Sequence, residues 1–86
     1  MKYFTYILYS ASHDRYYVGS CSDIEQRLER YNAGATPSTK AYRPWRIVYT
    51  EKFETKTEAL KREKYIKRMK SRKYIEALIG RGSSVV

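Results

Sequence analysis

Several kinds of residue are scarce in this sequence, and each shortage narrows the class of protein. The 86 residues include one cysteine, four glycines and two prolines. One cysteine argues against a scaffold held together by disulfides, which small secreted domains use to supplement a modest core, and it favours a reducing compartment. With 42% hydrophobic residues, the low glycine and proline content argues against a disordered tail.

Long apolar runs are also missing. The sequence has no run of about 18 apolar residues, so we expect no membrane-spanning helix. The amino-terminal stretch MKYFTYILYS lacks the long apolar region and the small-residue cleavage site of a signal peptide. We therefore expect a cytoplasmic protein with no segment inserted in a membrane.

Acidic residues are few, whereas basic residues are abundant. Eighteen Lys and Arg against nine Asp and Glu give a formal net charge of +9. Such a charge indicates a polyanionic partner, with nucleic acid the first candidate and an anionic membrane surface the second. Ten tyrosines favour nucleic acid, because aromatic faces interleaved with cations suit nucleotides.

The amino-terminal half predicts a hairpin and a helix. Residues 2–10 and 15–20 are rich in aromatic residues and flank the turn sequence ASHD, which predicts two paired strands. The next stretch, SDIEQRLERYNAG, has apolar residues at helical spacing. We expect its helix to begin at a capping box of Ser22 and Glu25 and to stop at Gly34.

The middle of the chain predicts a loop and a third strand. ATPSTKAYRP is polar and predicts the loop, and WRIVYTEKF predicts the strand. Strict alternation would place Trp45, Ile47 and Tyr49 on one face of the sheet and Val48 on the other.

Two helices follow the third strand. Thr55 and Glu58 form a capping box for a helix that continues to about Met69. Ser71 is the expected cap of another helix, which Gly80 is expected to end.

The resulting order of elements is β-β-α-β-α-α, an α+β fold with helices packed on a three-stranded sheet. We assign residues 1–80 to one domain and residues 81–86, RGSSVV, to a flexible C-terminal tail.

One acid stands inside a strongly basic segment. LKREKYIKRMKSRK contains eight Lys or Arg residues and a single acid, Glu63. On a helical wheel Glu63 falls about 40° from Ala59, in the apolar arc that also contains Ile66. Because burial of a lone carboxylate is costly, we expect an arginine, tyrosine or metal partner. The alternative is a structural salt bridge or hydrogen bond beneath the helix.

Three other side chains have both a functional and a structural interpretation. Arg27 lies on the flank of the apolar stripe of its helix, where an arginine also serves to cover apolar surface. Tyr6 and Tyr17 occupy the middle of the two hairpin strands, where they could lie side by side in a functional site. The structural interpretation is an ordinary aromatic cross-strand pair. Gly19 would let a backbone or a ligand approach closely.

The triplets FTY and YVG, followed by DIEQRLERYNAG and EALKREKYIK, resemble the GIY-YIG nuclease family over about residues 2–79. The likeness is closest to small stand-alone members, which are similar to the nuclease domain of the bacterial excision-repair incision subunit. The resemblance implies a three-stranded antiparallel sheet flanked by helices. It depends on an ordered set of residues: Tyr6, Tyr17, Gly19, Arg27, Tyr31, Asn32 and Glu63.

The resemblance also implies roles in a metal-dependent endonuclease that hydrolyses phosphodiester bonds in DNA, in repair or recombination. Glu63 matches the ligand of a single divalent cation, Mg²⁺ or Mn²⁺, and Arg27 matches the arginine near the scissile phosphate. Tyr31 matches a residue that supports the site. Tyr6 and Tyr17 match the motif tyrosines, and we favour Tyr6 as the base, with its pKa lowered by Arg27 or the metal. The reverse assignment of the two tyrosines is open.

The sequence departs from the family pattern at several positions. FTY lacks the glycine and isoleucine of the first triplet, and Ser20 stands where some relatives carry a lysine. No residue clearly matches an asparagine that some relatives place after the glutamate. We assign no role to His13 or Cys21.

The basic residues around the acid are expected to grip the sugar-phosphate backbone. About six phosphate contacts would lose on the order of 10³-fold in affinity between about 50 and 200 mM salt. We favour DNA over RNA, and the small surface leaves room for partner proteins to direct the domain. The alternative function is a non-catalytic nucleic-acid-binding module that retains the fold. The expected contact residues are Lys61, Arg62, Lys64, Lys67, Arg68 and Lys70.

Overall fold

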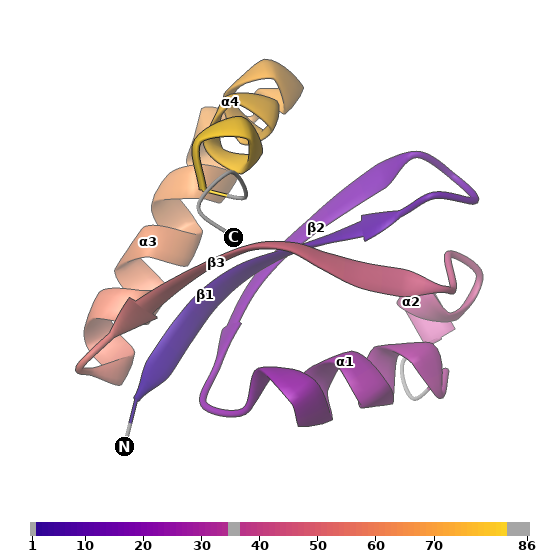
Figure 1. Cartoon of the computed structure of the whole chain (residues 1–86), viewed down its shortest axis with the longest axis horizontal. Coiled ribbons are helices and arrows are strands. Elements are labelled where there is room, and N and C mark those ends of the chain that lie inside the picture. The colour runs from indigo at the N-terminus through magenta and orange to yellow at the C-terminus, as the bar shows by residue number, and fades with distance from the viewer. Residues whose placement is uncertain (1, 35–36, 83–86) are drawn as a thin grey trace.

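The structure is a computed structural model, and it describes residues 2–34 and 37–82 (Figure 1). The expected α+β fold is confirmed, with one additional short helix. The strands are β1 (Tyr3–Ser10), β2 (Arg15–Cys21) and β3 (Trp45–Phe53), and the helices are α1 (Ile24–Asn32), α2 (Pro37–Lys40), α3 (Lys56–Met69) and α4 (Arg72–Gly82).

The three strands form one antiparallel sheet in the order β2-β1-β3, so β1 is central and β2 lies at an edge. Tyr6 is paired with Gly19, and Leu8 is paired with Tyr17. Residues that face each other across a pair of strands share a face of the sheet. Tyr6 and Tyr17 are therefore diagonal neighbours on one face and not a directly opposed pair.

A β-bulge interrupts the pairing of β1 with β3. Ile7 pairs with Tyr49 and Leu8 pairs with Ile47, so Val48 is an extra residue on β3. A bulge shifts the alternation of side chains by one position. The expectation that Tyr49 shares a face with Trp45 and Ile47 is therefore wrong, because Tyr49 packs together with Val48 on the opposite face.

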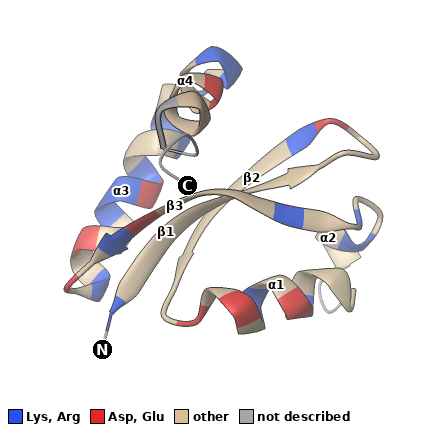
Figure 2. Cartoon of the chain, viewed as in Figure 1, with Lys and Arg blue, Asp and Glu red and all other residues tan. Residues whose placement is uncertain are grey.

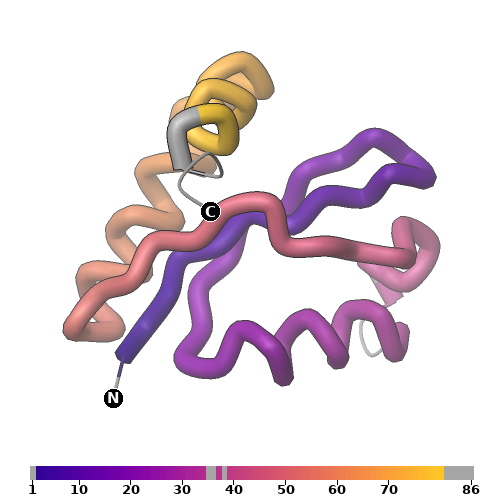
Figure 3. The backbone as a smooth tube through the Cα atoms, viewed as in Figure 1, coloured from indigo at the N-terminus to yellow at the C-terminus, as the bar shows by residue number. Residues whose placement is uncertain are grey.

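Helices cover both faces of the twisted sheet (Figures 1 and 3). One face lies against α1, and the other lies against α3 and α4. Alternation along β1 sends successive side chains to opposite faces and so produces two core clusters. The buried residues of the cluster on the α1 face are Tyr6, Leu8, Cys21, Tyr31 and Trp45, and those of the cluster on the α3 face are Ile7, Val18, Ile66 and Leu78.

The first helix begins one residue later than expected. Asp23, and not Ser22, is the N-cap, and its carboxylate accepts a hydrogen bond from the backbone N–H of Gln26 at 3.0 Å. The predicted Ser22–Glu25 capping box is therefore wrong, because aspartate is an equally good cap one position along. The predicted stop is confirmed, since Gly34 follows the helix with φ +79°, a conformation that favours glycine.

The predicted polar loop contains the single turn α2, which begins at Pro37. Proline is favoured at the first position of a helix because its missing N–H would have no partner there. The cap of α3 is as expected, since Thr55 Oγ1 accepts from the backbone N–H of Glu58 at 3.2 Å.

The expected cap of the last helix is confirmed, but its expected end is wrong. Ser71 Oγ accepts from the backbone N–H of Tyr74 at 3.1 Å. Gly80 does not end α4, which continues through Gly82. The first two residues of the predicted tail therefore belong to a helix, and residues 83–86 lie outside the described residues. Within the described ranges, no helix is long and apolar enough to span a membrane.

Candidate functional site

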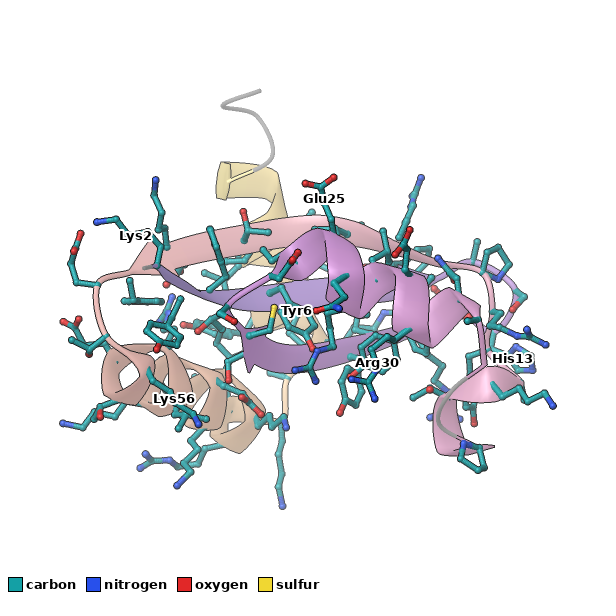
Figure 4. The ribbon with its side chains drawn as sticks, turned by 90° about the horizontal axis from the view of Figure 1, so that it is seen from below. Lys2, Tyr6, His13, Glu25, Arg30 and Lys56 are labelled. Carbon is teal, nitrogen blue, oxygen red and sulfur yellow. The ribbon has the colours of Figure 1, made fainter. Side chains whose placement is uncertain are left out.

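Three tyrosines meet on the α1 face of the sheet. Tyr6 is 1% exposed, and its hydroxyl oxygen lies 3.4 Å from that of Tyr31, at the end of α1. The ring of Tyr17, on β2, lies edge-on to that of Tyr31 with their centroids 5.3 Å apart. Figure 4 labels Tyr6 near the centre of this face. We call Tyr6, Tyr17 and Tyr31 the phenol cluster.

Gly19 makes the cluster possible. A Cβ atom at Gly19 would lie 2.5 Å from the hydroxyl oxygen of Tyr6 and 2.7 Å from its Cζ. The absence of a side chain therefore admits the Tyr6 ring, whereas the sequence had suggested a backbone or a ligand at this position.

Burial disfavours ionisation of two of the phenols, Tyr6 and Tyr31. Burial raises the pKa of Tyr6, although its hydrogen bond to Tyr31 and the charge of Arg27 act in the opposite direction. Burial also raises the pKa of Tyr31, and hydrogen bonds to Tyr17 and Tyr6 raise it further. Arg27 thus lowers the pKa of Tyr6 as expected, but the larger effect of burial leaves that pKa above its ordinary value, so the expected net decrease is wrong. Tyr6 is a poor candidate for a base at neutral pH.

Arg27 extends from α1 beside this cluster. Its side chain is exposed, and its positive charge lowers the pKa of both Tyr6 and Cys21, although burial raises each of them more. The predicted proximity of an arginine to the motif tyrosines is therefore present on this face.

Glu63 turns towards the sheet, as its place on the helical wheel predicts. Its side chain is 17% exposed. Oε1 accepts a hydrogen bond from Ser20 Oγ at 2.7 Å, and Oε2 accepts one from Lys67 Nζ at 2.7 Å. The expected arginine or tyrosine partner is wrong. The structure instead shows the alternative, a hydrogen bond from a serine of the edge strand together with a salt bridge to a lysine one helical turn later.

The acid and the phenol cluster approach each other at the β2 edge of the sheet. Ser20 and Tyr17 belong to the same strand but project from opposite faces, because their positions differ by an odd number. Lys67 connects the two sides, since its Nζ contacts Glu63 and lies 5.7 Å from the centroid of the Tyr17 ring. The structure thus joins Glu63 to Tyr17, the member of the phenol cluster at the sheet edge, through Lys67. Tyr6, Tyr31 and Arg27 have no such contact with Glu63 among the described residues.

The donor set fits a cation that keeps most of its water. Among the described residues, no group of three or more His, Cys, Asp or Glu side chains is placed to enclose a metal. Glu63 offers one carboxylate whose two oxygens each have one hydrogen-bond partner, so acceptor capacity remains. Mg²⁺ commonly binds through one or two carboxylates and retains several waters, which this arrangement permits.

Of the six residues predicted to bind phosphate, two are already in ion pairs with acidic side chains and four are exposed. Arg62 donates through Nε and Nη2 to the two oxygens of Glu51, each at 3.0 Å, and Lys67 is paired with Glu63. The other four are exposed and form no ion pair within the described ranges. Figure 2 shows basic residues along α3 and at its junction with α4. The four exposed residues are Lys61, Lys64, Arg68 and Lys70.

Sequence reasoning gave no role to two residues that build the site. Asn32 accepts from the backbone N–H of Trp45 at 2.6 Å and donates to its carbonyl oxygen at 3.1 Å, which fixes the end of α1 against β3. Ser20 was read only as a departure from the family. For the ion pair between Glu63 and Lys67, the sequence does contain a signal, because Lys67 lies four residues after Glu63 on the same helix.

Residues 2–75 match the GIY-YIG catalytic domain. UPF0213 proteins from the Mu50 and COL strains of Staphylococcus aureus are each 43% identical to the chain over 67 residues, which cover 77% of this chain and 80% of the relative. The solution NMR structure of a UPF0213 protein from Bacillus halodurans matches with a TM-score of 0.58 and 30% identity, covering 93% of this chain and 84% of that one. The chain therefore belongs to the GIY-YIG family, a family of endonucleases.

Proposed function

We propose that this protein is a metal-dependent endonuclease that hydrolyses phosphodiester bonds in DNA. The observation that carries the proposal is the carboxylate of Glu63, which is 17% exposed, turns towards the sheet and is held by Ser20 on the same edge strand as Tyr17. Membership of a nuclease family and a net charge of +9 support the same function.

Each side chain has a role that its surroundings support. Arg27, exposed beside the phenol cluster, would bind the phosphate through a planar guanidinium. Tyr17 is only partly buried and lies closest to the acid, so we assign to it the contact with the attacking water. Tyr6 and Tyr31, which stay protonated, position Tyr17 through the hydrogen bonds of the cluster.

Glu63 would hold the divalent cation, Mg²⁺ or Mn²⁺, and the bound ion would neutralise negative charge on the phosphate. Ser20 fixes the carboxylate from the edge strand at 2.7 Å. A carboxylate held in one orientation is a better ligand than a mobile one, because less conformational freedom is lost on binding.

A cleavage assay tests the proposal. Labelled single-stranded, duplex and branched DNA would be incubated with Mg²⁺ or Mn²⁺, with EDTA as the metal-free control. We expect Glu63→Gln to abolish cleavage and Glu29→Gln, which removes an exposed charge from α1, to cleave like the wild type. Undiminished cleavage by Glu63→Gln would rule out the metal-binding role of this residue.

The alternative is a non-catalytic module that binds nucleic acid. The Glu63–Lys67 ion pair favours this function, because the carboxylate already has a cation at 2.7 Å. The alternative predicts salt-sensitive binding without cleavage of any substrate and the same affinity for wild type and Glu63→Gln.

A further inference from the structure

A groove runs along the outer edge of β2, from the candidate site towards the turn of the hairpin. It lies between β2 and the junction of α3 with α4 and encloses about 540 Å³. Tyr17 and Lys67 line its inner end, and Arg15, Lys70 and Arg72 line the remainder. The groove therefore begins at the proposed cleavage site and leads away from it.

Two of the cations in the groove are available to a polyanion. Arg15 and Lys70 are exposed, and neither forms an ion pair with a described residue. Lys70 is the C-cap of α3 with φ +47°, where the chain turns into α4. By contrast, the ammonium of Lys67 is already paired with Glu63. Arg15 and Lys70 are therefore the groove residues suited to phosphate contacts.

Unlike Arg15 and Lys70, Arg72 has its planar guanidinium group fixed by hydrogen bonds. Its Nη1 and Nη2 donate to the backbone carbonyl and the carboxylate of Asp14, and its Nε donates to Glu76 at 3.0 Å. One side of the guanidinium faces the ring of Tyr16, whose centroid lies 5.0 Å from Arg72 Cζ. Yet 49% of the side chain is exposed. Because most donors are occupied, this guanidinium suits stacking better than phosphate binding, and unpaired bases stack on such planes.

We propose that this groove binds a single-stranded segment of nucleic acid, with phosphates on Arg15 and Lys70 and a base stacked on Arg72. A base inside a duplex is already stacked on its neighbours, so only an unpaired segment can use the Arg72 plane. From Glu63 to Lys70 the helix rises about 10 Å, which spans about three nucleotides at the spacing of a stacked strand. The direction of the segment, leading from the cleavage site, rests on the proposed function.

Binding measurements in EDTA test the stacking contact without interference from cleavage. Fluorescence anisotropy would compare a labelled single strand with a duplex of the same sequence. Arg72→Lys keeps the charge but loses the plane, so we expect about a fivefold or greater loss of single-strand affinity and an unchanged duplex affinity. Arg46→Lys is the matched control, because Arg46 Cζ also faces a tyrosine, 5.5 Å from the Tyr9 centroid, but lies on β3, outside the groove.

A salt titration tests the phosphate contact. Lys70→Asn removes the charge with a residue that tolerates positive φ. We expect it to reduce the slope of log affinity against log salt by about 0.7 for the single strand. Lys52→Asn removes the same charge from β3 and should leave the slope unchanged.

Two results would overturn the groove assignment: equal effects of Arg72→Lys and Arg46→Lys, or equal salt slopes for Lys70→Asn and Lys52→Asn. Far-UV circular dichroism confirms that each variant is folded. The outcome is separable from the endonuclease proposal. A protein that cleaves DNA but binds single strands without Arg72 refutes the groove alone, whereas one that binds through Arg72 but never cleaves refutes only the endonuclease.

Discussion

Replacing Gly19 with alanine should strain the centre of the phenol cluster. The new Cβ would lie 2.5 Å from Tyr6 Oη, 2.7 Å from Cζ and 3.2 Å from Cε1. Non-bonded carbon atoms prefer separations of about 3.5–4.0 Å, so the overlap is about 1 Å. The Tyr6 ring is rigid and 1% exposed, so the surrounding core opposes its displacement. Overpacking a core in this way costs about 1–3 kcal/mol.

For a domain of this size, about 2 kcal/mol lowers the melting temperature by roughly 8–16 °C. Urea denaturation and thermal melting, both followed by circular dichroism, measure the change. Gly80→Ala is the matched control, because a Cβ there meets no atom within 4 Å and Gly80 lies inside α4. In that exposed helical position alanine should stabilise by about 0.5–1 kcal/mol.

A double-mutant cycle identifies the cause of the strain. In the wild type, Tyr6→Phe removes the hydroxyl that contacts Tyr31 and should cost about 0.5–1.5 kcal/mol. In the Gly19→Ala background the same change removes the atom closest to the new methyl group, so it should cost less or stabilise. A free energy of unfolding for Gly19→Ala within about 0.5 kcal/mol of the wild type, or simple additivity of the two changes, would contradict steric overlap between the new methyl group and Tyr6.

Three further perturbations have defined outcomes. Asn32→Ala should destabilise by about 1–3 kcal/mol in urea denaturation, because it leaves the backbone N–H of β3 that bonds Asn32 at 2.6 Å without its acceptor. The contribution of Tyr6 and Tyr31 to stability should be constant between pH 7 and about 10 and fall above that, because their raised pKa values mean that the unfolded chain loses these protons first. Denaturation from pH 7 to 11 checks this, and a flat profile would contradict it. Arg62→Gln should destabilise by about 1–2 kcal/mol by leaving the partly buried Glu51 without its bidentate partner, whereas the salt slope of DNA binding should not change.

Much of the fold could be predicted from local patterns. The cap at Thr55 and the bounds of the third strand are confirmed, because a capping box and an apolar strand pattern are each encoded in a few adjacent residues. The start of α1 was misplaced, since Ser22 and Asp23 are both good caps and only the tertiary structure selects between them. The bulge at Val48 depends on pairing with a distant strand, so alternation within β3 alone does not reveal it.

The candidate site was predicted only in part. The helical wheel predicts that Glu63 faces the sheet, and the structure confirms this. One carboxylate within an apolar arc is a strong local signal. Its partner Lys67 could have been predicted from its spacing of four residues along the helix, whereas its partner Ser20 follows from the alignment of α3 along the edge strand, which no local pattern specifies. The state of Tyr6 was misjudged because the arginine is visible in the sequence, whereas the depth of burial that outweighs it is not.

At the turn between α3 and α4, thermal stability and affinity for a polyanion favour different residues. Lys70 holds a left-handed backbone conformation that glycine would adopt without steric penalty, yet its ammonium belongs to the groove. Lys70→Gly should therefore leave the protein as stable as before or up to about 1 kcal/mol more stable, while weakening its hold on a polyanion. Selection for thermal stability alone would therefore enrich glycine at position 70, and the selected variants would bind a polyanion more weakly than the wild type.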